Sequence, residues 1–158
     1  MLFRSGRTEK RGKVIIQTYN PFHQILQQAS MNKYDEMFSD QLNERKQYRY
    51  PPFFRLIKLT FKHRDYNKTD EATNWFAQAL RNTISNYNTD GNLNLEVLGP
   101  ESPPIGRVRN EYIKNVLIKL PPGTSVKTTK EIIKKIGKSF HAIAQYRSVR
   151  VIINVDNY

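Results

Sequence analysis

The hydrophobic pattern changes near residue 51 from helical spacing to alternation. Upstream, a short apolar run at residues 14–16 lies in a β-branched segment and predicts a buried strand. Two helices are expected after it, one at residues 22–29 and one from Asn32, where apolar side chains recur at steps of three and four. The second helix is otherwise polar, so we expect its single apolar stripe to lie on a partner surface.

After two consecutive prolines, Pro51 and Pro52, the pattern predicts four strands and two helices. Each proline disfavours the helical conformation of the residue before it, so we place a domain boundary here. Short alternating or apolar segments indicate strands, and two amphipathic stripes with helical spacing indicate helices. The expected strands cover residues 54–62, 93–97, 112–120 and 149–155, and the expected helices cover residues 67–87 and 126–146.

The order β, α, β, β, α, β is that of the split β-α-β, or ferredoxin-like, arrangement. We therefore expect an α+β fold, in which a four-stranded antiparallel sheet carries two helices on one face and follows a strand-and-helices extension. The extension covers residues 1–50 and the ferredoxin-like domain covers residues 51–158. The open face of the sheet is expected to show Lys58, Thr60, Lys62, Arg150 and Ile152.

The charge of the chain favours a polyanionic partner. It has 26 Lys and Arg against 14 Asp and Glu, a formal net charge of +12. The excess is concentrated between residues 102 and 150, where the only acidic residues are Glu111 and Glu131. Clustered positive charge binds phosphate backbones well because binding releases their counterions. A solvated lysine surface is the alternative explanation.

Residue patterns typical of catalysis or metal binding are absent from the sequence. There is no cysteine, and the three histidines lie far apart, so the spacing of metal ligands is missing. Neither a phosphate-cradling glycine loop nor a nucleophile elbow occurs. We expect no enzyme activity, metal or other cofactor in this chain. The lack of cysteine and of a long apolar run also makes the cytoplasm the expected location.

The candidate functional feature is the basic, proline-containing stretch at residues 98–119. Arg107 and Arg109 lie one residue apart beside an expected tight turn, where two guanidinium groups can contact phosphates or base edges. Tyr112 can stack on an unpaired base. Alternatively, the arginines are solvated or paired with nearby glutamates, and Tyr112 belongs to the core. The expected DNA-binding residues are Arg107, Arg109, Tyr112, Lys114, Lys58 and Lys62.

The last expected helix carries a row of lysines that suits an acidic partner. Lys127, Lys130, Lys134 and Lys138 follow one another at steps of three and four, so they lie on one side of the helix. Such a row favours phosphate or an acidic peptide. A solvated outer face, opposite the isoleucine stripe, explains it equally well.

Several segments together resemble the C-terminal part of the bacterial primosomal replication-restart helicases of the PriA family, also called primosomal protein N′. They are KRGKVIIQTYNP, the polar helix ending in RYPPF, LGPESPPIGRVRNEYIKNVLIK and VRVIINVD. The segment from Arg4 to Arg7 is similar to the tail of the sixth helicase motif, whose arginines contact ATP phosphates in that family. The Walker elements, the cysteine-rich zinc module and the N-terminal DNA-binding domain have no counterpart here.

This resemblance implies a C-terminal fragment of an ATP-dependent 3′ to 5′ DNA helicase, with no ATPase of its own. It implies the tail of the second helicase lobe with connecting helices, followed by a domain that holds branched or single-stranded DNA. ATP and zinc belong to the intact family, and no cofactor is expected in the fragment. The implied partners are DNA, the acidic tail of single-stranded-DNA-binding protein, other primosome proteins and the rest of the helicase chain, in the bacterial cytoplasm with the nucleoid.

The resemblance also assigns roles to particular residues. It implies that Arg4 and Arg7 are the remnant of a nucleotide site, that Arg107 and Arg109 form the family's arginine-rich loop, and that the acidic tail docks on the lysine row. The implied partner-binding residues are Lys127, Lys130 and Lys134. Two other functions stay open at this point: a structural brace of the helicase core without DNA contact, and a stand-alone RNA-binding domain of ribosomal type.

Overall fold

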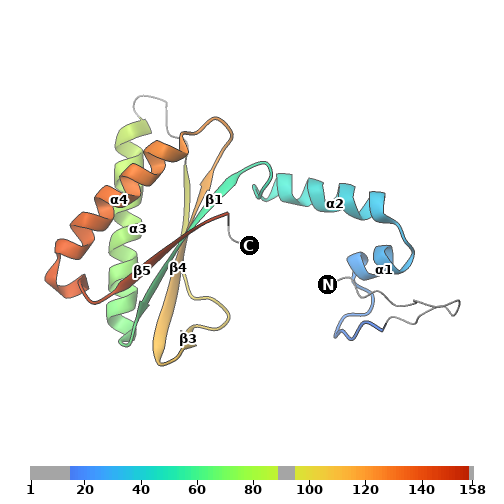
Figure 1. The fold of residues 1–158 in the computed structure, drawn as a ribbon, viewed down its shortest axis with the longest axis horizontal. Helices are drawn as coiled ribbons and strands as arrows, with labels where there is room; N and C mark the ends of the chain where they lie inside the picture. Colours follow the sequence, from blue (N-terminus) through green and yellow to red (C-terminus); the bar gives the residue numbers. More distant parts are fainter. Residues whose placement is uncertain (1–14, 89–94, 157–158) are drawn as a thin grey trace, which may run out of the picture. The chain divides into compact units, whose positions relative to one another are not determined.

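The computed structural model describes residues 15–88 and 95–156, which fall into two units (Figure 1). The first unit covers residues 1–42 and the second covers residues 43–158. Helix α1 (Gln24–Ser30) lies in the first unit, and helix α2 (Tyr34–Gln47) continues from the first unit into the second. The two helices expected from the sequence are therefore confirmed. No helix in the described residues has the length and apolar character needed to cross a bilayer.

Polar contacts hold α1 against the first turns of α2. The Asp40 carboxylate accepts hydrogen bonds from the side-chain amides of Gln24, at 2.8 Å, and Gln28, at 2.7 Å. The strand expected at residues 14–16 is not formed in residues 15–19, and the Ile15 side chain is exposed. A strand needs a neighbour to pair its backbone groups, and none of the described strands pairs with this segment.

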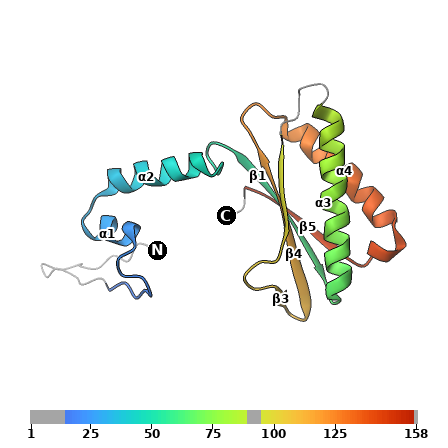
Figure 2. The ribbon, with the colours of Figure 1, turned by 180° about the vertical axis from the view of Figure 1, so that it is seen from behind.

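The second unit contains a five-stranded antiparallel sheet covered on one face by two helices (Figures 1 and 2). Its elements are β1 (Arg55–His63), α3 (Tyr66–Asn88), β2 (Glu96–Glu101), β3 (Arg107–Val108), β4 (Glu111–Leu120), α4 (Val126–Ala142), the 3-10 turn η1 (Ala144–Tyr146) and β5 (Arg150–Val155). The strand order is β2-β4-β1-β5, and the short β3 pairs with β4. This order confirms the α+β, ferredoxin-like prediction, with β3 added.

Successive side chains along the strands point alternately to the helix-covered face and to the open face of the sheet. Ile57, Leu59 and Phe61 of β1 are fully buried under α3 and α4. On β4, Ile118 is the register partner of Ile57 and Val116 is the partner of Leu59. Aromatic rings fill the centre of this core, with edge-to-face pairs that add to the burial of apolar area. Phe61, Phe76 and Phe140 meet one another edge to face at 5.2 to 6.0 Å between centroids, Tyr146 stacks on Phe140 at 5.3 Å, and Trp75 lies tilted against Phe140 at 5.9 Å.

The last helix ends earlier than its apolar pattern predicts. α4 ends at Ala142 because Ile143 adopts an extended conformation, and the chain then makes a 3-10 turn. The 3-10 turn places the Tyr146 ring nearly parallel to the Phe140 ring. Tyr146 therefore packs in the core although it lies beyond the end of the helix.

The residues before Pro51 pack on the open face of the sheet. The Lys119 ammonium donates a 2.7 Å hydrogen bond to the Tyr48 carbonyl and lies 4.4 Å from the centre of the Tyr50 ring. Arg49 forms a 3.1 Å ion pair with Glu96 of β2. The second unit thus includes residues 43–50, while the domain boundary at residue 51 stays a prediction.

Candidate nucleic-acid interface

A tight hairpin places the two candidate arginines at one end of the sheet. β3 and β4 pair through Arg107 with Tyr112 and Val108 with Glu111, which leaves Arg109 and Asn110 as the turn. Both turn residues have positive φ, at 49° and 63°, as a two-residue type I′ hairpin requires. Asn suits this conformation and Arg does not. The backbone therefore holds the Arg109 side chain at the tip of the hairpin.

The guanidinium groups of Arg107 and Arg109 are exposed and have no carboxylate partner among the described residues. Arg107 donates to the Asn110 side-chain oxygen and lies 4.9 Å from the centre of the Tyr112 ring. Glu111, the neighbouring acid, accepts instead from Arg150 at 2.6 Å. Of the described residues, none hydrogen-bonds to the Arg109 side chain. Both groups can therefore take an external anion.

The base of the hairpin is braced by an aromatic pair and an ion pair. Tyr112 is half-buried, and its ring meets Tyr66 of α3 edge to face at 5.5 Å between centroids. Lys114 lies 5.4 Å from the centre of the Tyr66 ring and donates to the Asp70 carboxylate. That hydrogen bond, aided by the charge of Asp70 and opposed by burial, raises the pKa of Lys114 above its ordinary value of 10.5.

Because Lys114 is committed to Asp70, we place it in the support of the hairpin and not in the contact surface. Its side chain is only 12% exposed, so a ligand has little access to the ammonium group. Asp70 precedes Lys114 by 44 residues, and no local spacing relates them. The sequence shows that Lys114 is charged, but only the folded structure shows that Asp70 is its partner.

The six residues expected to bind DNA do not form one patch. The register places Lys58 and Lys62 on the open face of the sheet, opposite Leu117 and Ile113, whereas Tyr112 lies on the helix-covered face. At the centre of the open face, the buried Thr60 hydroxyl donates a 3.0 Å hydrogen bond to the Asn115 side-chain oxygen, so these polar groups are not available to a ligand. Lys58 and Lys62 therefore lie on the face of the sheet opposite to that of Tyr112.

Arg64 is a candidate that the sequence analysis missed. It is exposed and directly follows His63, the β1 residue paired with Tyr112 at the hairpin end of the sheet. In the sequence, Arg64 is only one more basic residue after an alternating strand. In the fold, this end of β1 lies at the base of the hairpin, which places Arg64 near it.

The lysine row of α4 lies as expected on the outer side of the helix. Lys127, Lys130, Lys134 and Lys138 are exposed, and within the described chain none of them is in a salt bridge. The helix starts at Ser125, whose hydroxyl accepts a 3.2 Å hydrogen bond from the Thr128 amide. Arg4 and Arg7, the expected nucleotide-site remnant, lie outside the described residues.

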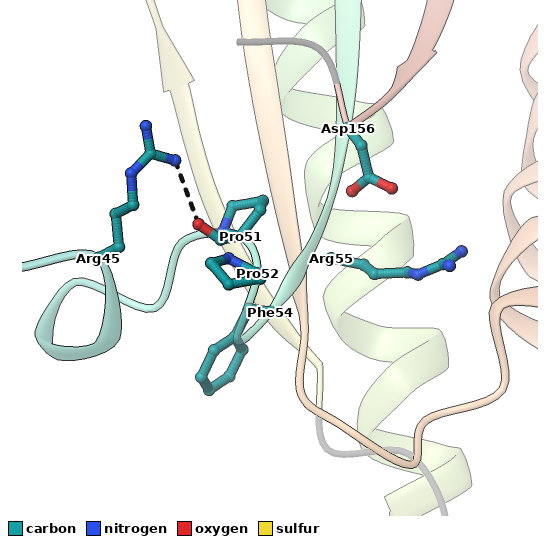
Figure 3. Close-up of a pocket in the computed structure, with 6 residues that line it drawn as sticks. All are labelled: Arg45, Pro51, Pro52, Phe54, Arg55 and Asp156. Carbon is teal, nitrogen blue, oxygen red and sulfur yellow. Dashed lines mark hydrogen bonds between the residues drawn. The ribbon is translucent and has the colours of Figure 1, made fainter. Parts of the chain in front are cut away.

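A pocket of about 410 Å³ beside Pro51 and Pro52 contains two more arginines (Figure 3). The figure shows Arg45 and Arg55 pointing to opposite sides, and Arg45 donates a 3.1 Å hydrogen bond to the Pro51 carbonyl. The Asp156 carboxylate accepts from the Leu56 amide at 3.0 Å. These groups satisfy the backbone where the chain enters the sheet, and the two cations do not converge on one ligand.

Comparison with known proteins gives one consistent result. The family model of the primosomal protein N C-terminal domain matches residues 46–158. The replication restart protein PriA of Bacillus subtilis (strain 168) is 28% identical over 155 residues, which are 98% of this chain and 18% of that protein. PriA of Synechocystis sp. is 33% identical over 137 residues, 84% of this chain and 15% of that protein. The chain thus spans less than a fifth of the length of these relatives.

Proposed function

The chain belongs to the family of primosomal protein N C-terminal domains, and from that premise we propose that it binds branched or single-stranded DNA through the β3–β4 hairpin as part of replication restart. The observation that carries the proposal is the pair of exposed guanidinium groups on the hairpin, Arg107 and Arg109, which have no carboxylate partner in the described chain. We assign no ATP hydrolysis to this chain, since the resemblance places the nucleotide-binding motifs elsewhere in the family.

The shape of the hairpin supports phosphate binding. A two-residue turn fixes the backbone of Arg109, so little backbone freedom is lost when the guanidinium binds an anion. The Arg107 guanidinium carbon lies 4.9 Å from the centre of the Tyr112 ring, a contact that orients the group, and Arg107 remains exposed. We therefore assign Tyr112 to holding Arg107, because its ring already contacts that guanidinium and the Tyr66 ring.

The direct test is fluorescence anisotropy with a labelled DNA fork and a labelled single strand, at about 50 and 200 mM salt. We expect binding by the wild type at low salt and a loss of about tenfold or more in affinity in the variant Arg107→Ala/Arg109→Ala. The matched control is Lys46→Ala/Lys135→Ala, which removes two positive charges from exposed sites outside the hairpin. This control should bind within about twofold of the wild type if the position of the charges matters.

The other two functions predict different outcomes in the same titration. A structural brace gives no binding of either DNA at low salt. A ribosomal-type domain prefers folded RNA to the DNA fork. Equal losses in the hairpin variant and the control would show that total charge alone governs binding, and would refute the hairpin as the site.

A further inference from the structure

The outer edge of β5 is apolar and unprotected. In the described chain β5 pairs only with β1. Ile153 is 51% exposed and Val155 is 37% exposed, although both lie on the helix-covered face, where their register partners on β1 are core residues. Native sheets commonly protect such an edge with charged residues or proline, and neither occurs between Arg150 and Asp156. The edge is therefore suited to pairing with another strand.

Hydrogen bonding within the sheet decides which backbone groups of β5 point outward. The Asp156 amide donates a 2.8 Å hydrogen bond to the Leu56 carbonyl, and these two residues continue the register of β5 with β1. In an antiparallel ladder, residues whose backbone groups face the partner strand alternate with residues whose groups face away from it. The N–H and C=O groups of Val151, Ile153 and Val155 therefore point to the free edge.

The order of side chains makes the strand complementary to itself. In an antiparallel pair of two copies centred on Ile153, this residue faces its own counterpart and Val151 faces Val155 of the second copy. The three pairs would exchange about six main-chain hydrogen bonds. At each end of the pair, Arg150 comes opposite Asp156 of the second copy, because both lie at the same distance in sequence from Ile153. Apolar side chains thus meet apolar ones, and each cation meets an anion.

The two end residues have the capacity for this ion pair. The Arg150 side chain is 56% exposed, and one of its amino groups donates to Glu111 at 2.6 Å, which leaves other donors of the guanidinium. The Asp156 carboxylate accepts from the Leu56 amide through Oδ1, so its second oxygen can accept from a further donor. Moving the centre of the pair by one residue removes both ion pairs, so charge specifies the register.

Pairing would also cover a groove beside the strand. The groove has a volume of about 560 Å³, lies between β5 and α4, and has Phe76, Val151 and Ile153 in its apolar lining. The pair is symmetric about a two-fold axis perpendicular to the sheet, so both copies keep their helices on the same face. Val155 of the second copy, opposite Val151, would therefore add an apolar side chain beside the groove.

We infer that two copies of this chain associate through β5, antiparallel and centred on Ile153, to form one continuous sheet. A nucleic acid has no N–H and C=O groups that continue the ladder. The net charge of +12 on each copy opposes association, but at about 0.15 M salt charges more than roughly 8 Å apart are largely screened. The inference goes beyond the hairpin site and uses none of its residues.

The first test is sedimentation equilibrium of the whole 158-residue chain. We expect a monomer–dimer equilibrium with a Kd of about 10 to 100 µM, as befits a small interface. Ile153→Lys places like charges opposite each other at the centre of the pair, so it should weaken association by about tenfold or more. The matched control is Ile105→Lys, the same change at a loop residue that is 69% exposed, which should alter the Kd by less than about twofold.

An exchange of charges tests the register. Arg150→Asp and Asp156→Arg each place like charges at both ends of the pair, so each variant alone should associate more weakly than the wild type by about tenfold. Mixed in equal amounts they should form a heterodimer with an affinity within about threefold of the wild type, because each acid again meets an arginine.

Cross-linking tests the same register without changing a charge. The chain has no cysteine, so Ile153→Cys introduces a single thiol that faces its counterpart in the pair. A short bismaleimide should link this variant into covalent dimers. Gln78→Cys, exposed on α3, is the control and should be linked at least about tenfold less.

Four results would overturn the inference. They are a wild type that stays monomeric up to about 300 µM, undiminished association of a folded Ile153→Lys variant, a mixture of the charge variants that associates no better than either alone, and equal cross-linking of the two cysteine variants. Arg107→Ala/Arg109→Ala should associate as the wild type does, whether or not it binds DNA. Failure of this inference is therefore distinguishable from failure of the hairpin site.

Discussion

Arg109 has a backbone conformation that costs stability. Its φ of 49° lies in the left-handed region, where a residue with a Cβ is less stable than glycine by about 1 kcal/mol or more. A glycine would satisfy the turn but would remove the guanidinium from the tip. The proposed function accounts for an arginine at a position where the backbone favours glycine.

Arg109→Gly should therefore separate stability from binding. Relief of the left-handed strain should raise the free energy of unfolding by about 0.5 to 1 kcal/mol, while DNA affinity falls because one guanidinium is lost. Urea unfolding and DNA anisotropy on the same samples check both effects. A less stable variant, or one with unchanged affinity, would contradict this account of the tip.

Lys114 and Asp70 mark the limit of sequence analysis at this scale. The sequence shows a lysine on a strand near two arginines, which is why it predicts a DNA contact. It cannot show that Asp70, 44 residues away on α3, takes up the ammonium group. Side-chain pairing across elements depends on the packing of α3 on the sheet, which local spacing does not encode.

Asp70→Asn should lower stability with a defined dependence on pH. Loss of the anionic partner of a largely buried lysine should cost about 1 to 2 kcal/mol near neutral pH. The pKa of Lys114 is raised above 10.5 in the folded protein, so its contribution is complete below the ordinary lysine pKa and is lost as pH rises through the folded pKa.

Urea unfolding of wild type and Asp70→Asn at pH values of about 7, 9 and 11 tests this sign. The difference between the two proteins should be equal at the first two pH values and smaller at the third. A gap that widens in alkali would show that Asp70 does not stabilise the charged lysine.

At the scale of secondary structure, periodicity predicted the helices and most of the sheet because each buried face repeats its own spacing. It did not predict β3, which exists only through its pairing with β4. It also ended β2 too early. β2 continues to Glu101 through an irregularity between Leu98 and Glu101, where Arg81 of α3 donates to the Gly99 carbonyl. Proline and glycine in a sequence indicate a loop, but here they lie inside a bulged strand.

Gly99 is the residue on which this bulge depends. Its φ is +97°, and a Cβ atom there would lie 2.8 Å from the Asn115 backbone oxygen. Gly99→Ala should lower the free energy of unfolding by about 2 to 3 kcal/mol, since it combines strain with a backbone clash.

Gly123→Ala is the matched control for Gly99→Ala. Gly123 has a φ of +86°, but a Cβ atom there would meet nothing within 4 Å, so only the strain of about 1 kcal/mol applies. Urea unfolding compares the two variants. Equal losses would mean that close approach of β2 to β4 does not constrain residue 99.

At the scale of the whole molecule, the net charge of +12 overstates what is available to a ligand. Lys114 is bound to Asp70, Lys119 is buried against Tyr48, and Arg150 is paired with Glu111. The sequence gives the number of basic side chains. Strand register and helix packing decide which of them are free to bind a ligand, so the sequence could indicate a polyanionic partner but not the surface that binds it.

The most direct test of the account is the salt dependence of single-strand binding in wild type and Arg107→Ala/Arg109→Ala. Each phosphate contact on a single strand contributes about 0.7 to the slope of log Kd against log salt concentration. If each arginine contacts one phosphate, the slope of the variant should be smaller by about 1.4. Identical slopes for the two proteins would contradict the claim that the hairpin binds DNA.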